Sequence, residues 1–234
     1  MKTLKTLVLV FLALATTGAF IACKKNNDNK KICNIIDAAI VGGGDIHISY
    51  NSDGRISQAA VGIGSVYKFS YNGDSVIVLN TDSGAFQSKI TYANNSSRLA
   101  TYQRTEYDQA GTNWSVVKYE YNGDELSKST TTTSSGGLPI VNTYAWFDQN
   151  MVAQASGSNT TVYEYYTDKP EQSGDYFYFT QLIQGGTIVR NKNLIKSASG
   201  STFNYAFNSD GNISSLEIVG TGSASVLNYT YQCN

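Results

Sequence analysis

The chain has 234 residues, of which only 15% are charged and 12% are aromatic, including 17 tyrosines. Lys plus Arg (17) nearly balances Asp plus Glu (18), and this balance argues against an electrostatic nucleic-acid binder, which needs a basic stripe. The single His excludes a multi-His metal site and leaves one imidazole as a general base. The length suits one large all-β domain or two small ones, with enough chain for a sizeable core.

Residues 1–22 have the pattern of a secretory signal peptide. Lys2 and Lys5 precede an uncharged, largely apolar run that ends in Ala22, and such a basic start followed by an apolar stretch and a small residue is typical of export signals. Cys23 follows directly. This junction resembles a bacterial lipobox, which implies that Cys23 is acylated and anchors the chain to a membrane; the alternative is ordinary cleavage beside an incidental Cys. The polar residues 23–31 then form a tether.

Cys33 and Cys233 lie near the two ends of the exported domain, residues 32–234. Disulfides persist in the oxidising compartment to which a signal peptide leads. We therefore expect a Cys33–Cys233 disulfide that links the first strand of the domain to the last one. The alternative is two unpaired, buried thiols.

An aromatic phrase recurs along the whole domain, each time as a strand, a turn and a return strand. Tyr50, Tyr71 and Tyr92 are spaced 21 residues apart, and a fixed period of this size is typical of repeat architectures. Apolar side chains alternate with polar ones within each strand, which predicts a sheet with one apolar and one wet face. We expect an all-β fold of about 16–18 strands and no helix.

These strands should form one long, curved antiparallel meander of hairpins. Because so many strands cannot stay flat, the sheet should be an open twisted sheet, a half-barrel or a closed barrel. A transmembrane barrel is disfavoured, since its strands would need an apolar outer band. Asn72-Gly73 predicts a two-residue turn, Asn51 to Gly54 a type I turn with a Gly bulge, and residues 127–139 a long loop.

Two phrases, at residues 50–56 and 205–213, resemble the tyrosine-aspartate (YD) repeats of the RHS superfamily, which build a spiralling β-sheet. A second resemblance covers residues 33–233. A lipobox, degenerate repeats of this kind, the Lys-Asn-Leu stretch at 192–196 and the final Tyr-x-Tyr-x-Cys are similar to those of small Bacteroidota lipoproteins classed as a domain of unknown function. The resemblance implies an outer-membrane lipoprotein, on either the periplasmic or the surface face, and implies no activity.

Aromatic side chains are the candidate binding residues. By strand parity the Trp114 indole faces water, and residues 163–179 place aromatic groups on both faces of a predicted strand. Such surfaces suit a sugar or a protein partner, because Tyr and Trp offer flat faces with polar tips. The alternative for the second segment is a strand covered on both sides. The candidates are Trp114, Tyr163, Tyr165, Tyr166, Tyr176 and Tyr178.

The sequence favours a non-catalytic binding or scaffold module that is anchored through Cys23 and recognises a glycan or an envelope protein. We expect no cofactor, metal or catalytic residue. His47 is read as an exposed strand residue, because no G-x-S-x-G motif accompanies it. Two alternatives stay open: a periplasmic lipid carrier, and a glycan-acting hydrolase whose carboxylates would come from Glu106, Asp108, Glu120, Glu164 and Glu217.

Overall fold

The structure is a computed structural model that describes residues 33–233. It contains sixteen β-strands and one α-helix, α2, in these residues. The elements are β1 (Cys33–Ile40), β2 (Ile46–Tyr50), β3 (Ile56–Val61), β4 (Ser65–Asn72), β5 (Ser75–Asp82), β6 (Ala85–Asn94), β7 (Ala100–Glu106), β8 (Trp114–Asn122), β9 (Glu125–Thr133), β10 (Ile140–Phe147), β11 (Asn150–Ser156), β12 (Asn159–Pro170), α2 (Tyr176–Gln184), β13 (Asn193–Ala198), β14 (Ser201–Phe207), β15 (Ile213–Gly220) and β16 (Ser223–Cys233).

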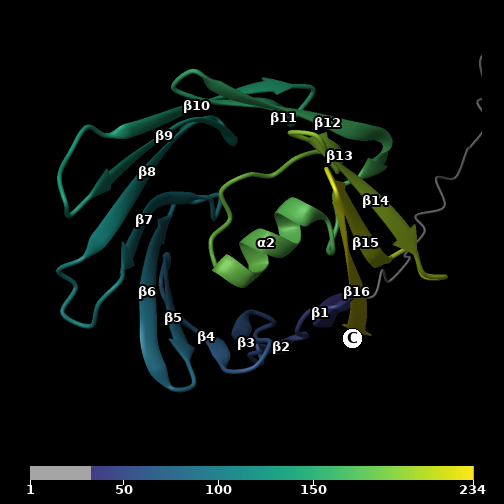
Figure 1. Ribbon diagram of the computed structural model, residues 1–234, viewed down its shortest axis with the longest axis horizontal. Coiled ribbons are helices and arrows are strands. Elements are labelled where there is room, and N and C mark those ends of the chain that lie inside the picture. Colours follow the sequence, from purple (N-terminus) through teal and green to yellow (C-terminus); the bar gives the residue numbers. More distant parts are fainter. Residues whose placement is uncertain (1–32, 234) are drawn as a thin grey trace, which may run out of the picture. The chain divides into compact units, whose positions relative to one another are not determined.

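The strands form a closed antiparallel barrel (Figure 1). Each strand pairs with its neighbours in the sequence, and β1 pairs with β16 to close the ring. The predicted all-β meander is therefore confirmed. Of the three shapes that the sequence left open, the protein adopts the closed barrel. Closure satisfies the backbone groups that an open sheet of this length would expose along two edges.

A disulfide joins Cys33 to Cys233, as the sequence predicts, with an S–S distance of 2.02 Å. The two residues face each other in the β1–β16 ladder, at the seam where the barrel closes. The covalent bond thus links the first and last strands, which are 200 residues apart in sequence.

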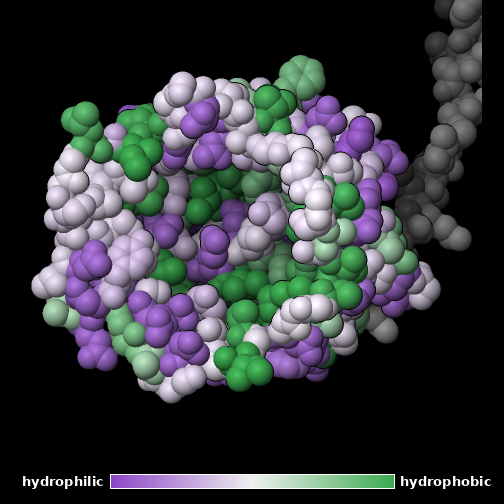
Figure 2. Space-filling view, in the orientation of Figure 1, coloured by the Kyte–Doolittle hydropathy of each residue, from purple (hydrophilic) through white to green (hydrophobic). Residues whose placement is uncertain are grey.

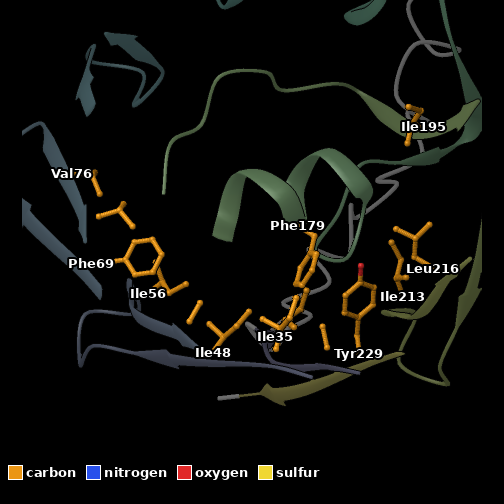
Figure 3. Packing of buried hydrophobic residues seen from close by; sticks show 14 of the residues in the cluster. Ile35, Ile48, Ile56, Phe69, Val76, Phe179, Ile195, Ile213, Leu216 and Tyr229 are labelled. Carbon is orange, nitrogen blue, oxygen red and sulfur yellow. The ribbon is translucent and has the colours of Figure 1, made fainter. Parts of the chain in front are cut away.

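The apolar face of the sheet points into the barrel. In β4, Phe69 is buried whereas its neighbours Lys68 and Ser70 are exposed, as the alternation of a half-buried strand requires. Inward side chains from β1 to β7 and from β13 to β16 pack with Phe179 of α2 into one core, part of which is drawn in Figure 3. The Phe179 ring lies 5.1 Å from that of Tyr229, centroid to centroid.

Helix α2 lies inside the ring of strands (Figure 1) and corrects the expectation that the chain has no helix. The aromatic run at 176–179 reads as a strand, yet Asp175 caps its N-terminus by accepting a hydrogen bond from Phe177 N, and Gly185 ends it at φ +83°. Such caps define helix ends. The helix has apolar side chains on several sides because the barrel encloses it. Within residues 33–233 no helix is long and apolar enough to cross a membrane.

The turns partly follow the sequence prediction. Gly54 (φ +80°) donates its N–H to Asn51 O, as expected for a type I turn with a bulge. The β4–β5 turn is shifted by one residue, because Asn72 still pairs with Ser75 and the connecting residues are Gly73-Asp74. The predicted loop at residues 127–139 is wrong over its first half. Its threonines extend β9 to Thr133, since β-branched side chains suit a strand.

Candidate functional site

Three arginines line a cavity of about 360 Å³ inside the barrel. Arg55 comes from the β2–β3 turn, Arg98 from the β6–β7 turn, and Arg190 from the segment between α2 and β13. The tyrosines Tyr50, Tyr71 and Tyr178 complete its main side-chain lining, and no Asp or Glu is among the residues that line it. We call it the arginine cavity. Figure 2 shows that the barrel face is hollowed, with hydrophilic and hydrophobic residues inside the hollow.

Arg55 is held in place by two contacts. Its Nε donates to Asp53 Oδ2 over 2.7 Å, and its guanidinium carbon lies 4.2 Å from the centre of the Tyr71 ring. The guanidinium lowers the pKa of Asp53, mainly through this hydrogen bond. Stacking and ion pairing together fix the orientation of the planar group.

Arg98 is the least engaged of the three cations. Its backbone lies at φ +60° in the β6–β7 turn, where Arg98 N donates to Asn95 O and the next residue, Leu99, is fully buried. The side chain of Arg98 is exposed. Among residues 33–233 its guanidinium makes no hydrogen bond or ion pair. All five N–H donors of this group are therefore available to a ligand.

Arg190 lies near the carboxyl group of Glu171, and it lines a further pocket together with Asp124 and Glu125. Burial and the neighbouring Asp175 raise the pKa of Glu171 to about 8, against the opposing effects of the Asn191 N–H and Arg190. Glu171 is therefore mostly protonated at neutral pH and does not cancel the charge of Arg190. Of the three cations that line the cavity, Arg55 is paired with Asp53, whereas neither Arg98 nor Arg190 makes an ion pair within residues 33–233.

The buried carboxyl group of Asp175 fixes α2 to the wall, and with it one side of the cavity. It accepts hydrogen bonds from Phe177 N (3.0 Å), Ile195 N (3.2 Å) and the Tyr205 hydroxyl (2.8 Å). Burial raises the pKa of Asp175, and the three donors offset part of the cost of burying the group. Asp175 has no exposed surface, so its role is structural.

The segment that carries Arg190 is held by a single side chain of α2. The Gln181 carbonyl oxygen accepts from Ile188 N (2.5 Å) and Val189 N (2.7 Å), and its amide donates to Val189 O over 2.9 Å. These three hydrogen bonds anchor the backbone of Ile188 and Val189, the two residues that precede Arg190. The guanidinium is thus positioned by the helix and not by the strands alone.

Three guanidinium groups in one cavity can bind an anion. A guanidinium presents parallel N–H donors that match the oxygens of a carboxylate, phosphate or sulfate. The partly enclosed position strengthens each such contact relative to open water. Within residues 33–233 no group of three or more His, Cys, Asp or Glu residues is placed to hold a metal ion.

The structure does not gather the predicted aromatic residues into one surface. Trp114 is partly exposed at the start of β8, with Arg104 over its ring at 5.1 Å. The tyrosines of β12 are partly buried; Tyr163 and Tyr165 donate hydrogen bonds to β11, and Tyr166 to Phe203 O. Tyr178 lines the arginine cavity, whereas Tyr176 lines a different one. As binding residues the six stay predictions: Trp114, Tyr163, Tyr165, Tyr166, Tyr176 and Tyr178.

The carboxylates proposed for hydrolysis make contacts away from the arginine cavity. Glu120 pairs with Lys128, Glu164 with Lys196, and Glu106 with Lys89 and Arg104. Asp108 accepts three hydrogen bonds within the β7–β8 hairpin, and Glu217 accepts from Asn204. His47 is exposed and hydrogen-bonds to Asp37. Cys23, the signal segment and the tether lie outside the described residues.

Sequence reasoning missed the arginine cavity, although one signal was present. The chain has four arginines, and three of them line this one cavity. Two of these three, Arg55 and Arg98, lie in the turns that follow the strands of Tyr50 and Tyr92, two repeat periods apart. Their shared position in the repeat could have indicated that they meet at the same end of the barrel.

The comparisons with known proteins concern the fold. Neither protein-family models nor curated proteins match the sequence. A porin-like protein from Bacteroides uniformis matches with a TM-score of 0.57 and 16% identity, over 80% of this chain and 90% of that chain. A porin-like protein from Bacteroides vulgatus matches with a TM-score of 0.58 and 14% identity, over 85% and 98%. At these identities the likeness shows that the chain shares the barrel fold of these two proteins.

Proposed function

We propose that the protein is a non-catalytic binding barrel of the cell envelope, tethered by an acylated Cys23, that holds a small anionic ligand. The observation that carries the proposal is the arginine cavity, where Arg55, Arg98 and Arg190 converge without a carboxylate in the lining. Small-molecule sites are typically concave and pre-formed, with a few convergent polar groups. Both criteria are met here.

Three features support the envelope location. The signal pattern of residues 1–22 and the lipobox resemblance at Cys23 predict export and anchoring. The Cys33–Cys233 disulfide is a bond that persists in oxidising compartments. The shared fold with two Bacteroides porin-like proteins agrees with a bacterial envelope barrel.

The ion pairs on the outer face of the barrel favour a barrel whose wall is exposed to water. Ion pairs join neighbouring strands on the outside: Lys128 Nζ lies 2.7 Å from Glu120 Oε1, and Lys89 Nζ lies 3.4 Å from Glu106 Oε2. A transmembrane barrel needs an apolar band there. The two most exposed large apolar side chains, Ile63 and Leu138, lie in hairpin connections and not on the wall. Under this proposal the anchor, and not the barrel, holds the protein at the outer membrane.

The alternatives are less well supported by the geometry. Hydrolysis by paired carboxylates would need two such groups facing one substrate site, whereas Glu120, Glu164 and Glu217 each bond to a neighbour on the outer wall. A lipid carrier would need an empty apolar interior. Here α2 occupies part of that interior and packs against the wall through Phe179, and the cavity beside it is lined by three arginines.

The test is calorimetric titration of the purified protein with four anions: phosphate, sulfate, citrate and glucuronate. We expect at least one of them to bind, and the R98A/R190A double variant to weaken this binding by about tenfold or more, because two charge-assisted contacts are lost. The fourth arginine supplies the control: Arg104→Ala removes the same side chain from the outer wall and should leave the affinity within about twofold. Absence of binding to all four anions, or binding that is unchanged in the double variant, would refute the proposal.

A further inference from the structure

A second cavity, of about 270 Å³, lies between α2 and the wall formed by β9 to β11. Its polar and aromatic lining comes from Tyr144 and Gln154 on the wall and from Tyr176, Phe177 and Gln184 on the helix. We call it the neutral cavity, because none of its lining residues is charged. It differs in this respect from the arginine cavity on the other side of Gln181, a residue that lines both.

The wall of the neutral cavity carries a network of uncharged hydrogen-bonding groups. Gln154 Oε1 accepts from the Tyr163 hydroxyl over 3.1 Å, and the Tyr144 hydroxyl lies 2.9 Å from Ser129 Oγ. The first contact fixes the orientation of the Gln154 amide and leaves its two N–H donors without a partner among residues 33–233. These donors are positioned before any ligand arrives.

The helix adds a second amide across the cavity. Gln184, in the last turn of α2, is exposed, and its side chain makes no hydrogen bond within residues 33–233. Tyr176 and Phe177 add aromatic surface, with ring centroids 5.7 Å apart and planes 66° apart. The side chains of Leu126, Met151 and Val189 form an apolar cluster that also lines the cavity.

We infer that the neutral cavity binds an uncharged sugar ring. A sugar combines apolar C–H faces, which suit aromatic and aliphatic side chains, with hydroxyls that pair with amides and phenols. The volume lies just below the ~300 Å³ at which pockets for drug-sized ligands begin, which suits one ring of a longer chain. An alkyl chain would cover the partly buried Gln154 amide without pairing its N–H groups, at a cost, and an anion would find no cation in the lining.

The inference is independent of the proposed anion site and has its own test. The full chain, in phosphatidylcholine vesicles, is titrated with glucose, galactose, mannose and N-acetylglucosamine, and contact is read by saturation-transfer NMR and calorimetry. We expect at least one sugar to bind. Gln154→Leu and Gln184→Leu, which keep side-chain bulk but remove the amides, should together weaken this binding by about tenfold.

Two controls separate the outcomes. Gln87→Leu, at an exposed β6 position that does not line the cavity, and the R98A/R190A double variant should both bind the sugar as the unmodified chain does. Sugar binding that is lost in R98A/R190A but kept in Q154L/Q184L would overturn the inference and assign the sugar to the arginine cavity. The inference would also be overturned if none of the four sugars binds. It would be overturned as well if the protein binds the apolar dye N-phenyl-1-naphthylamine tightly and none of the sugars displaces the dye.

Discussion

The recurring tyrosines connect neighbouring hairpins through hydrogen bonds. Their hydroxyls donate to backbone carbonyls of the preceding hairpin: Tyr50 to Ile35 O over 2.7 Å, and Tyr71 to Ile56 O over 2.8 Å. Trp146 makes the equivalent bond from Nε1 to Leu126 O. Burial raises the pKa of Tyr71 to about 12, so the phenol stays a donor at neutral pH. The sequence repeat is therefore a hydrogen-bonding repeat as well as a hydrophobic one.

At the same scale, Glu171 should make anion binding depend on pH. Its pKa is raised to about 8, so the carboxyl is neutral below pH 8 and becomes negative above it. Ionisation places a negative charge beside Arg190, and the affinity for sulfate, which does not titrate in this range, should fall as pH rises from 7 to 9. Titration of sulfate at several pH values measures the effect.

Two variants isolate Glu171 as the group responsible. Glu171→Gln should keep the affinity nearly constant between pH 7 and pH 9, because the amide cannot ionise. Glu120→Gln, which removes a carboxylate of the outer wall that is paired with Lys128, should keep the pH dependence of the unmodified protein. An unchanged dependence in Glu171→Gln would show that another group controls binding.

At the scale of the element, α2 depends on two glycines at its C-terminal end. A Cβ on Gly185 would lie 2.6 Å from Val78 Cγ2 and 2.9 Å from Phe69 Cε1, and one on Gly186 would lie 2.4 Å from the Tyr92 ring. The backbone at the end of the helix is thus in direct contact with side chains of the wall. This close approach sets the position of the segment that carries Arg190.

Gly185→Ala should therefore destabilise the protein. The left-handed conformation at φ +83° costs ~1–2 kcal/mol for an L-residue, and overpacking adds ~1–3 kcal/mol. We expect a loss of about 2–4 kcal/mol in the free energy of unfolding by urea. Gly123→Ala is the control, because Gly123 also has a positive φ (+63°) but has nothing within 4 Å of an added Cβ. Equal losses in both variants would show that packing at Gly185 contributes nothing.

At the scale of the whole molecule, the barrel has an apolar interior and charged pairs on its outer face. Its interior holds a packed core of apolar side chains around α2, and its exterior carries ion pairs such as Lys196 with Glu164. The core gathers on the β1–β7 and β13–β16 side, and a smaller cluster around Leu126 and Met151 lies on the β9–β11 side. This uneven filling leaves the space in which the cavities occur.

The stability of the closed barrel against unfolding should depend measurably on the disulfide. The Cys33–Cys233 bond closes a loop of 200 residues, for which chain entropy gives up to about 4–5 kcal/mol of stabilisation. The Cys33→Ser/Cys233→Ser double variant should unfold at lower denaturant, with a free energy of unfolding lower by about 2–5 kcal/mol. Dithiothreitol should lower the stability of the unmodified protein and leave that of the variant unchanged. Equal stability of the two proteins without reductant would contradict this prediction.

Much of the wall could be predicted from the sequence because its determinants are local. Two local patterns predict hairpins with an apolar face: the alternation in strands such as β4, and the 21-residue spacing of Tyr50, Tyr71 and Tyr92. Gly54 likewise indicates the turn between β2 and β3. Helix α2 could not be predicted in this way, because its aromatic residues satisfy the strand pattern equally well. Only the enclosure by the barrel makes a helix that is apolar on several sides favourable there.

The sequence by itself therefore determined the strands, their antiparallel order and the cysteine pair, since each depends on short-range pattern or on the two ends of the chain. The tertiary structure decided that the meander closes, that α2 lies inside, and that Arg55, Arg98 and Arg190 meet in one cavity. These three arginines are separated by 43 and 92 residues (98 − 55 and 190 − 98). The repeat places Arg55 and Arg98 at matching turns. That Arg190 joins them depends on the curvature of the barrel and on the hydrogen bonds of Gln181, which are properties of the assembled fold.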